Sequence, residues 1–257
     1  MCGRYASARK RQDLLEEFRI DRDRVSSDLE PDYNVAPTKP VYAVLTRSRR
    51  EPGEGSGPEA GTDDVARELR VVRWGLVPFW AKDPSIGSRM INARVETVDA
   101  KPAFRRAFAK RRCLLPADGF YEWLKVQDQG KVRKQPYYIH RADNGVLAFA
   151  GLYELWRDKS VPEDHPQAWL WTSVIITTRA EDEVGHIHER MPMVIDPARW
   201  DDWLDPANTE ASHLHTLLAP ASASGLATYP VGTDVNYVRN NGPALIKPLA
   251  GEPAPLV

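Results

Sequence analysis

The sequence predicts an α+β fold in one domain, in which mostly antiparallel strands form a barrel-like or bifurcated sheet core with surrounding helices. Its 257 residues are enough to bury one sizeable core. Hydrophobic residues make up 42% and charged residues 28%, which is typical of a soluble globular protein. Strand-like runs outnumber helix-like ones and follow each other closely, which favours antiparallel pairing over alternating βαβ units.

The elements can be placed in order along the chain. Ser7 is a candidate N-cap for a helix over residues 8–19, whose inward side chains are Leu14, Leu15 and Phe18. Short runs rich in β-branched and aromatic residues predict strands at 41–46, 69–74, 113–116, 120–126, 137–140, 146–152 and 169–178. Further helices are expected at 101–111, 197–204 and 209–218.

The domain is expected to span residues 1–248. Within it, residues 47–68 are almost free of apolar side chains and predict a flexible insertion between two strands, and residues 249–257 predict a disordered tail. No apolar run is long enough for a membrane span or a signal peptide, and two cysteines provide no disulfide framework. A cytoplasmic protein is therefore expected.

The chain begins Met1-Cys2-Gly3-Arg4. If the initiator methionine is removed, Cys2 carries both a thiol and an α-amine, and the amine is substantially unprotonated at neutral pH. Such a 1,2-aminothiol can add to an aldehyde through nitrogen and then close a ring through sulfur. The alternative is that Cys2 is an accident at a frayed terminus.

Charge is distributed unevenly, although the net charge is only −1. Residues 1–125 carry +5 and residues 126–257 carry −6. The segment 101–112 holds six cations and no acid, with Lys101, Arg105 and Arg106 among them. It can form a local phosphate-binding surface or simply the solvated face of a helix.

Two loops combine polar or aromatic side chains with proline or glycine. The turn at 33–38, with Asn34 and Pro37, can hold a nucleotide or simply end a strand. The segment 74–80 bends at glycine and proline, and its Phe79 and Trp80 can be core anchors or can stack on bases.

Three further clusters carry candidate chemistry. As a strand, 90–97 would align Asn92, Arg94 and Glu96 on one face, which suits phosphate or sugar oxygens or is only a polar surface. Glu122 stands between Tyr121 and Trp123, and burial there would raise its pKa and suit it to proton transfer.

The third cluster contains His186, His188 and Arg190. With no third ligand evident, metal binding is not expected, and a histidine beside an arginine fits acid–base work on a phosphate-bearing substrate better. Cys113 is expected to be a buried core thiol.

Six motifs occur in a fixed order, at residues 2–5, 34–38, 74–80, 92–97, 117–123 and 188–192, followed by Val238-Arg-Asn-Asn-Gly-Pro. In this order they resemble the SRAP family, the SOS-response-associated peptidases or abasic-site processing proteins, whose members crosslink to DNA. The resemblance runs from Cys2 to about Pro248 and implies the SRAP fold. The chain departs from the family pattern chiefly at 47–68, where no motif lies.

The resemblance implies a role for each matching residue. Cys2 is the covalent nucleophile, and Asn92, Glu122 and His188 complete the catalytic site. Arg4, Arg94 and Arg190 hold phosphates, and Phe79 and Trp80 form an aromatic wedge. Asn34, Pro37, Lys101, Arg105 and Arg106 complete the expected DNA-binding set. The residues alone leave open whether Glu122 or His188 acts as the base in each step.

The expected activity is formation of a thiazolidine crosslink between Cys2 and the aldehyde of an abasic site, with lyase and peptidase activity at the same residues. The expected partner is single-stranded DNA with abasic sites, in the DNA damage (SOS) response and associated with the nucleoid. No cofactor, metal, membrane or obligate protein partner is implied, and a monomer is the default. Two alternatives remain: an amidohydrolase with an N-terminal nucleophile, as in glutamine amidotransferases, and a non-covalent reader of modified or single-stranded DNA.

Overall fold

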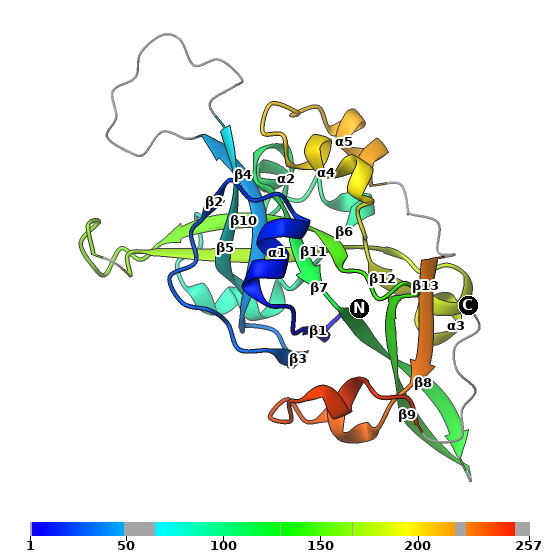
Figure 1. Ribbon diagram of the computed structural model, residues 1–257. Coiled ribbons are helices and arrows are strands. Elements are labelled where there is room, and N and C mark those ends of the chain that lie inside the picture. The colour runs from blue at the N-terminus through cyan, green and yellow to red at the C-terminus, as the bar shows by residue number, and fades with distance from the viewer. Residues whose placement is uncertain (1, 49–64, 129, 166, 219–224, 250–257) are drawn as a thin grey trace.

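The protein is described by a computed structural model that covers residues 2–48, 65–128, 130–165, 167–218 and 225–249 (Figure 1). Its strands are β1 (Tyr5–Ser7), β2 (Arg22–Asp23), β3 (Asp32–Val35), β4 (Pro40–Ser48), β5 (Val65–Trp74), β6 (Asn92–Arg94), β7 (Arg112–Ala117), β8 (Gly119–Asp128), β9 (Lys131–Arg141), β10 (Leu147–Arg157), β11 (Trp169–Arg179), β12 (Arg190–Pro192) and β13 (Leu226–Pro230). The α-helices are α1 (Arg11–Glu17), α2 (Arg105–Lys110), α3 (Asp182–Ile187), α4 (Trp200–Leu204) and α5 (Ala211–Leu217). Short 3₁₀ helices are η1 (Pro84–Arg89), η2 (Val95–Thr97), η3 (Pro197–Arg199), η5 (Thr233–Asn236) and η6 (Pro243–Ile246).

A five-stranded barrel forms the centre of the fold. Strands β11, β10, β7, β4 and β5 pair in that order, all antiparallel, and β5 closes the circle by pairing in parallel with β11. A second sheet has the order β13-β9-β8-β1-β3. These features confirm the predicted α+β class and its barrel-like, bifurcated core.

Strand alternation gives the barrel two buried faces. On β4, Val41 and Leu45 belong to an inner cluster that also contains Cys2, whereas Tyr42 and Val44 belong to an outer cluster. The outer cluster is covered by helices, and Figure 1 shows α2, α4 and α5 together on one side of the barrel. The inner cluster thus connects the barrel core directly to the start of the chain.

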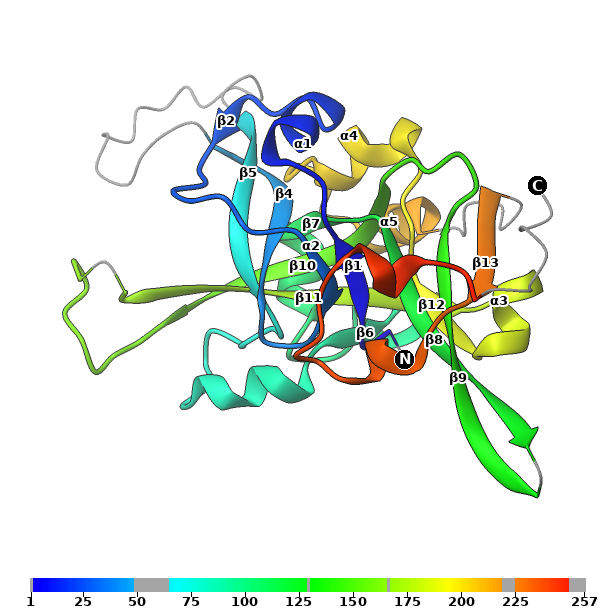
Figure 2. The ribbon, with the colours of Figure 1, turned by 60° about the horizontal axis from the view of Figure 1, so that its bottom comes forward.

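The β8–β9 hairpin extends beyond the rest of the second sheet. Figures 1 and 2 both show it projecting from the body of the molecule, on the side away from α4. Its ladder runs from Gly119 opposite His140 to Asp128 opposite Lys131. No helix in the described ranges is long and apolar enough to cross a membrane.

Several predicted boundaries were wrong. The first helix starts at Arg11, because Ser7 pairs with Asp32 as part of β1 and cannot cap a helix. Lys101 precedes α2, which starts at Arg105. The stretch 47–68 begins and ends as paired strand, at 47–48 of β4 and 65–68 of β5, and residues 49–64 lie outside the described residues.

One residue of the predicted tail is bound to β13. Leu249, assigned to the tail, donates its backbone N–H to the carbonyl of Pro230 at 3.0 Å. The tail residues 250–257 lie outside the described residues.

Candidate active site

The start of the chain lies against β8. The backbone N–H of Tyr121 donates to the carbonyl of Arg4 at 3.0 Å, which extends the β1–β8 ladder towards the amino terminus. Continued by one residue, this register sets Gly3 opposite Glu122, and the charge of Glu122 reaches the thiol of the preceding Cys2. The side chain of Cys2 is fully buried in the inner cluster.

Asn92 fixes the backbone of Cys2. It opens β6, which pairs with β11 so that Asn92 lies opposite Ile175. Its Nδ2 donates a hydrogen bond of 2.7 Å to the carbonyl oxygen of Cys2. Its Oδ1 is buried and accepts no hydrogen bond from any residue that the structure describes. A buried acceptor without a donor is costly, so Oδ1 is available to a group that enters the site.

Glu122 has the environment expected of a proton donor. Its side chain is only 3% exposed. Burial raises the pKa of its carboxyl to about 7, as the sequence predicts for this position. Burial, followed by the nearby charge of Glu122, raises the pKa of the Cys2 thiol well above its usual range. The thiol is therefore protonated at neutral pH.

The pKa of His188 is shifted in the opposite direction to that of Glu122. It follows α3, and its Nδ1 lies 3.0 Å from the backbone nitrogen and 3.2 Å from the carbonyl oxygen of Arg190, which together fix the ring. Burial is the first cause that lowers its pKa below the ordinary value. At neutral pH a neutral imidazole is thus present together with a carboxyl that is partly protonated.

The two groups line one cavity of about 370 Å³. Its lining residues come from β8, β9, the end of α3 and η5, and they are Glu122, Trp123, Lys125, Lys134, His188 and Asn236. Trp123 Nε1 donates to Asn236 Oδ1 at 2.7 Å and so joins η5 to β8. Lys125, Lys134 and Asn236 were missed in the sequence, and the only signal for the lysines is their position next to Glu122 in a predicted hairpin.

Arg4 and Asn34 bind each other. Arg4 Nη1 donates to Asn34 Oδ1 at 2.7 Å and to the carbonyl of Val235 at 2.8 Å. Asn34 is fully buried, and its Nδ2 donates to the carbonyls of Tyr237 and Asn240 at 3.0 and 2.9 Å. In this arrangement Asn34 holds the segment after η5 in place and presents no polar atom to solvent.

Arg190 is also bound within the protein. It is buried, and its guanidinium makes two hydrogen bonds to Glu96 and donates to the carbonyl of Thr177 at 2.6 Å. These bonds hold the pKa of Glu96 below its usual value. The expected single polar face at 92–96 was wrong, because β6 ends at Arg94 and η2 turns Glu96 towards Arg190.

The loop that carries the aromatic pair is fixed at its base. Gly75 has φ +125°, and a Cβ there would lie 2.5 Å from the carbonyl oxygen of Gly87, so the close approach of these segments requires glycine. Trp156 Nε1 donates to the carbonyl of Ala81 at 2.7 Å. Phe79 and Trp80, between these anchors, remain 49% and 52% exposed.

The remaining candidate cations lie on the surface. Arg106 stacks over the ring of Phe79, with 4.7 Å between its Cζ and the ring centroid. Lys101, Arg105 and Arg94 are exposed and form no ion pair with any acid of the described ranges. Pro37 is half-buried in the turn after β3.

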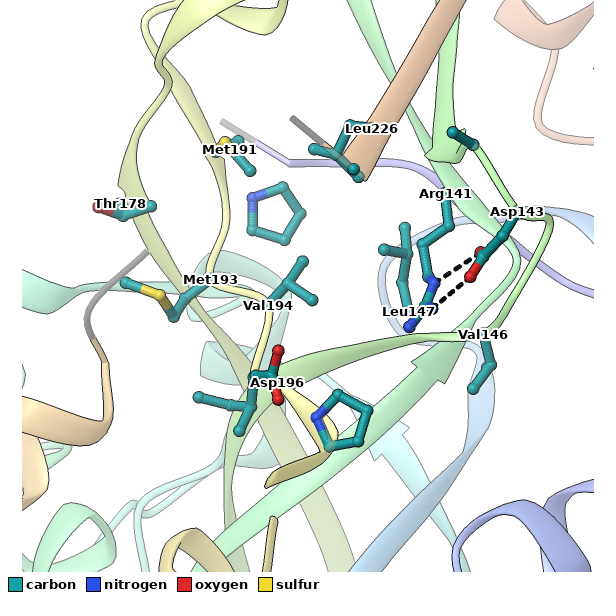
Figure 3. A pocket seen from close by; sticks show the side chains of 15 residues that line it. Arg141, Asp143, Val146, Leu147, Thr178, Met191, Met193, Val194, Asp196 and Leu226 are labelled. Carbon is teal, nitrogen blue, oxygen red and sulfur yellow. Dashed lines mark hydrogen bonds and ion pairs between the residues drawn. The ribbon is translucent and has the colours of Figure 1, made fainter. Parts of the chain in front are cut away.

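A second cavity, of about 380 Å³, has a different character (Figure 3). It is mostly apolar, with Leu147, Met193 and Leu226 in its lining, and its one arginine, Arg141, is paired with Asp143. None of the predicted site residues lines it. In the described part of the chain no three His, Cys, Asp or Glu side chains gather as metal ligands would.

The fold and site are those of a barrel protein that buries a cysteine at position 2 close to an amide and a carboxyl. The profile of the family SOS response associated peptidase (SRAP) matches residues 1–238, and the chain belongs to this family.

Curated relatives from distant organisms cover almost the whole chain. It is 38% identical to the abasic site processing protein YoqW of Bacillus subtilis over 96% of this chain and 99% of the relative. It is 32% identical to HMCES of Gallus gallus, covering 97% and 78%, and 30% identical to YedK of Escherichia coli, covering 97% and 100%. Both are also named abasic site processing proteins.

Solved structures support the same fold. A crystal structure of a protein from Bacteroides thetaiotaomicron superimposes with a TM-score of 0.77 at 26% identity, covering 96% of this chain and all of the other.

Proposed function

We propose that this protein processes abasic sites in single-stranded DNA by bonding covalently to them through Cys2. The observation that carries the proposal is the placement of Cys2, whose carbonyl is held by Asn92 and whose side chain lies beside Glu122. The names of the relatives in Bacillus subtilis, Gallus gallus and Escherichia coli support the substrate.

The reaction requires removal of Met1, because the nitrogen of Cys2 is otherwise part of a peptide bond. The freed amine then attacks the C1′ aldehyde of the open abasic sugar and gives a carbinolamine. Loss of one water gives an imine, and the Cys2 thiol adds across it, with sulfur bonding to carbon and the proton passing to nitrogen. The product is a five-membered thiazolidine that joins protein to DNA.

The two titratable groups divide the proton transfers. Groups whose pKa values are shifted in opposite directions are suited to opposite roles. Glu122, with its pKa raised to about 7, donates the proton that leaves with water from the carbinolamine. Neutral His188 accepts the proton that the attacking amine releases. Asn92 Oδ1 accepts a hydrogen bond from the Cys2 amine and orients it for attack.

The same residues suit two further reactions. At the imine stage the sugar can lose the 3′ phosphate by β-elimination, with His188 removing the C2′ proton, which is a lyase activity. Hydrolysis of the bond between Met1 and Cys2 would be the peptidase activity at the same residues.

The DNA strand is held by the exposed groups around the loop at 79–80. Phe79 and Trp80 stack on bases at the interruption left by the missing base. Arg94, Lys101, Arg105 and Arg106 hold backbone phosphates, and Pro37 borders the strand. Arg4, Asn34 and Arg190 contribute chiefly by shaping the pocket from within, because their polar groups are engaged by protein partners.

A denaturing gel tests the proposal. Protein lacking Met1 is mixed with single-stranded DNA that has one abasic site. We expect a band of protein bound to DNA that survives heating and is absent with Cys2→Ala or with Met1 retained. A non-covalent reader would give no such band, and its Cys2→Ala variant would bind normally.

The amidohydrolase alternative depends on the thiol as first nucleophile. A thiolate is the reactive form, and burial with the charge of Glu122 keeps the Cys2 thiol protonated. Amine attack does not need the thiolate, so the site favours the aldehyde reaction. Glutamine hydrolysis by the purified protein without any DNA adduct would reverse this conclusion.

A further inference from the structure

Two lysines face each other across the β8–β9 hairpin at the edge of the candidate site. Lys125 of β8 lies directly opposite Lys134 of β9 in the antiparallel register. Both side chains are exposed. Like charges directly opposite each other destabilise a ladder, so this position is unfavourable in the free protein.

No acid of the described residues forms an ion pair with either lysine of this hairpin position. Neither Lys125 nor Lys134 forms an ion pair with a carboxylate of the described ranges, whereas Lys39 and Arg9 each pair with an aspartate. The hairpin adds a further exposed cation, Lys131, near its turn.

The lysine pair lines the same cavity as the candidate acid and base. Lys125 and Lys134 share that 370 Å³ space with Glu122 and His188. The charge of Lys125 reaches His188, where it lowers the pKa of the imidazole less than burial and the amino-terminal charge do. Lys125 and Glu122 lie on opposite faces of β8, so an anion between the lysines would lie at the rim of this shared cavity.

The other polar groups of this wall also suit a sugar-phosphate backbone. Trp123 shares a face of β8 with Lys125, and its indole N–H is fixed by Asn236 of η5. Arg4 packs over the same ring, with its Cζ 6.0 Å from the ring centroid. The lysines thus extend from a rigid wall, and two flexible cations on such a wall suit one phosphodiester.

We propose that Lys125 and Lys134 together bind one backbone phosphate adjacent to the abasic sugar. This inference rests on the proposed function and adds a phosphate subsite to it, separate from the loop at 79–80 and from α2. The bound phosphate neutralises the like-charge pair and fixes the lesion sugar over Glu122 and His188.

Equilibrium binding separates this subsite from the reaction. The probe is a single-stranded oligonucleotide with one tetrahydrofuran abasic analogue, which has no aldehyde and cannot crosslink. We expect the Lys125→Gln/Lys134→Gln double variant to bind it roughly tenfold more weakly, as for loss of a charged hydrogen bond. Lys131→Gln, on the same hairpin but outside the cavity, is the matched control and should bind as the unchanged protein does.

Salt dependence shows how many phosphates the pair holds. For single strands, the slope of log affinity against log salt changes by about 0.7 for each phosphate that the protein neutralises. One shared phosphate predicts that the slope of the double variant is shallower by about 0.7, and a difference of about 1.4 would contradict sharing. An unchanged slope and affinity would overturn the subsite.

Methylphosphonate linkages then locate the phosphate. Replacing the charged phosphate on either side of the analogue should weaken binding to the unchanged protein at one of the two positions. At that position the double variant should lose no further affinity. If the double variant loses as much affinity as the unchanged protein at both positions, the lysines bind elsewhere and the proposal is wrong.

The crosslinking assay distinguishes this failure from failure of the proposed function. If the unchanged protein forms no crosslink with an abasic strand, the proposed function fails, whatever the lysines bind. If the protein crosslinks, and the double variant matches it at subsaturating DNA, the function stands and the subsite is overturned.

Discussion

The buried wall around Cys2 and the exposed surface around Phe79 and Trp80 are built in opposite ways. In the wall, Asn92 and Arg4 are held by hydrogen bonds of 2.7–2.8 Å within the protein. On the surface, Arg94 and Lys101 make no ion pair with a described acid. In the free protein, therefore, the polar groups of the wall are bound to one another, whereas the cations of the surface are not paired with described acids.

This difference separates candidate arginines that the sequence treats alike. Arg4, Arg94 and Arg190 each stand in a motif of the family and were assigned the same phosphate role. In the structure Arg190 is bound to Glu96 and Arg4 to Asn34, while Arg94 is exposed. Substitutions in the wall should therefore change rate or stability, and substitutions on the surface should change affinity.

The largest effect is expected from Glu122→Gln. Loss of the proton donor should slow crosslink formation at saturating DNA by roughly 10²–10⁴-fold, the usual contribution of general acid catalysis. The measurement is the single-turnover rate, with Glu163→Gln, an exposed glutamate outside the cavity, as control. An unchanged rate would remove Glu122 from the chemistry.

The pH dependence of the same variant adds a stability test. The pKa of Glu122 is raised to about 7, so the folded protein retains a proton that the unfolded chain loses near pH 4.5. The stability that the protonated carboxyl gives is present below pH 4.5 and is lost as the pH rises to 7. In urea unfolding, Glu122→Gln should lose less stability than the unchanged protein across this range. Parallel pH curves would contradict the raised pKa.

Arg190→Ala should mainly destabilise the fold. It removes a buried guanidinium and leaves the carbonyl of Thr177 without its donor, at a cost of about 2 kcal/mol in the free energy of unfolding. Arg94→Ala, the matched surface change, should stay within about 0.5 kcal/mol. Urea unfolding measures both, and equal stabilities would remove the distinction between the two arginines.

Trp80→Ala should weaken DNA binding without slowing the reaction at saturation. Stacking of a base on an aromatic side chain contributes about 1–3 kcal/mol, or roughly 5- to 150-fold in affinity. Trp169→Ala removes another exposed tryptophan, from the start of β11, and serves as control. The comparison fails if both changes weaken binding equally.

The smallest effect is expected from Arg94→Ala on salt dependence. The slope of log affinity against log salt should become shallower by about 0.7, because one phosphate is no longer neutralised. Lys159→Gln, an exposed cation far along the sequence, should leave the slope unchanged. A slope unaffected by Arg94→Ala would remove this residue from the DNA-binding surface.

The barrel could be predicted because its strands bury both faces. Runs such as 41–46 and 113–116 are apolar almost throughout, because alternate residues face the inner and the outer cluster and both clusters are buried. Their β character is therefore strong. The bounds of the short strands β1, β6 and β12 were not predicted, because three residues are too few to show the alternating pattern of a strand. Their pairing depends on partners far away in the chain.

The candidate site was predicted as a set of residues but not as an arrangement. The raised pKa of Glu122 could be predicted from its apolar neighbours. The bond between Asn92 and Cys2 spans ninety positions, and no spacing rule connects them. Likewise, Lys125 and Lys134 resemble ordinary surface lysines until the register sets them opposite each other.

The central claim is tested most directly by the intact mass of the protein–DNA product and the site of its modification. Condensation at Cys2 predicts the mass of the Met1-free protein plus that of the abasic strand, less one water. The DNA remnant should lie on Cys2, with neither its thiol nor its amine free and with no mass change on borohydride treatment. Attachment to a lysine, or an adduct that borohydride reduces, would contradict ring closure at Cys2.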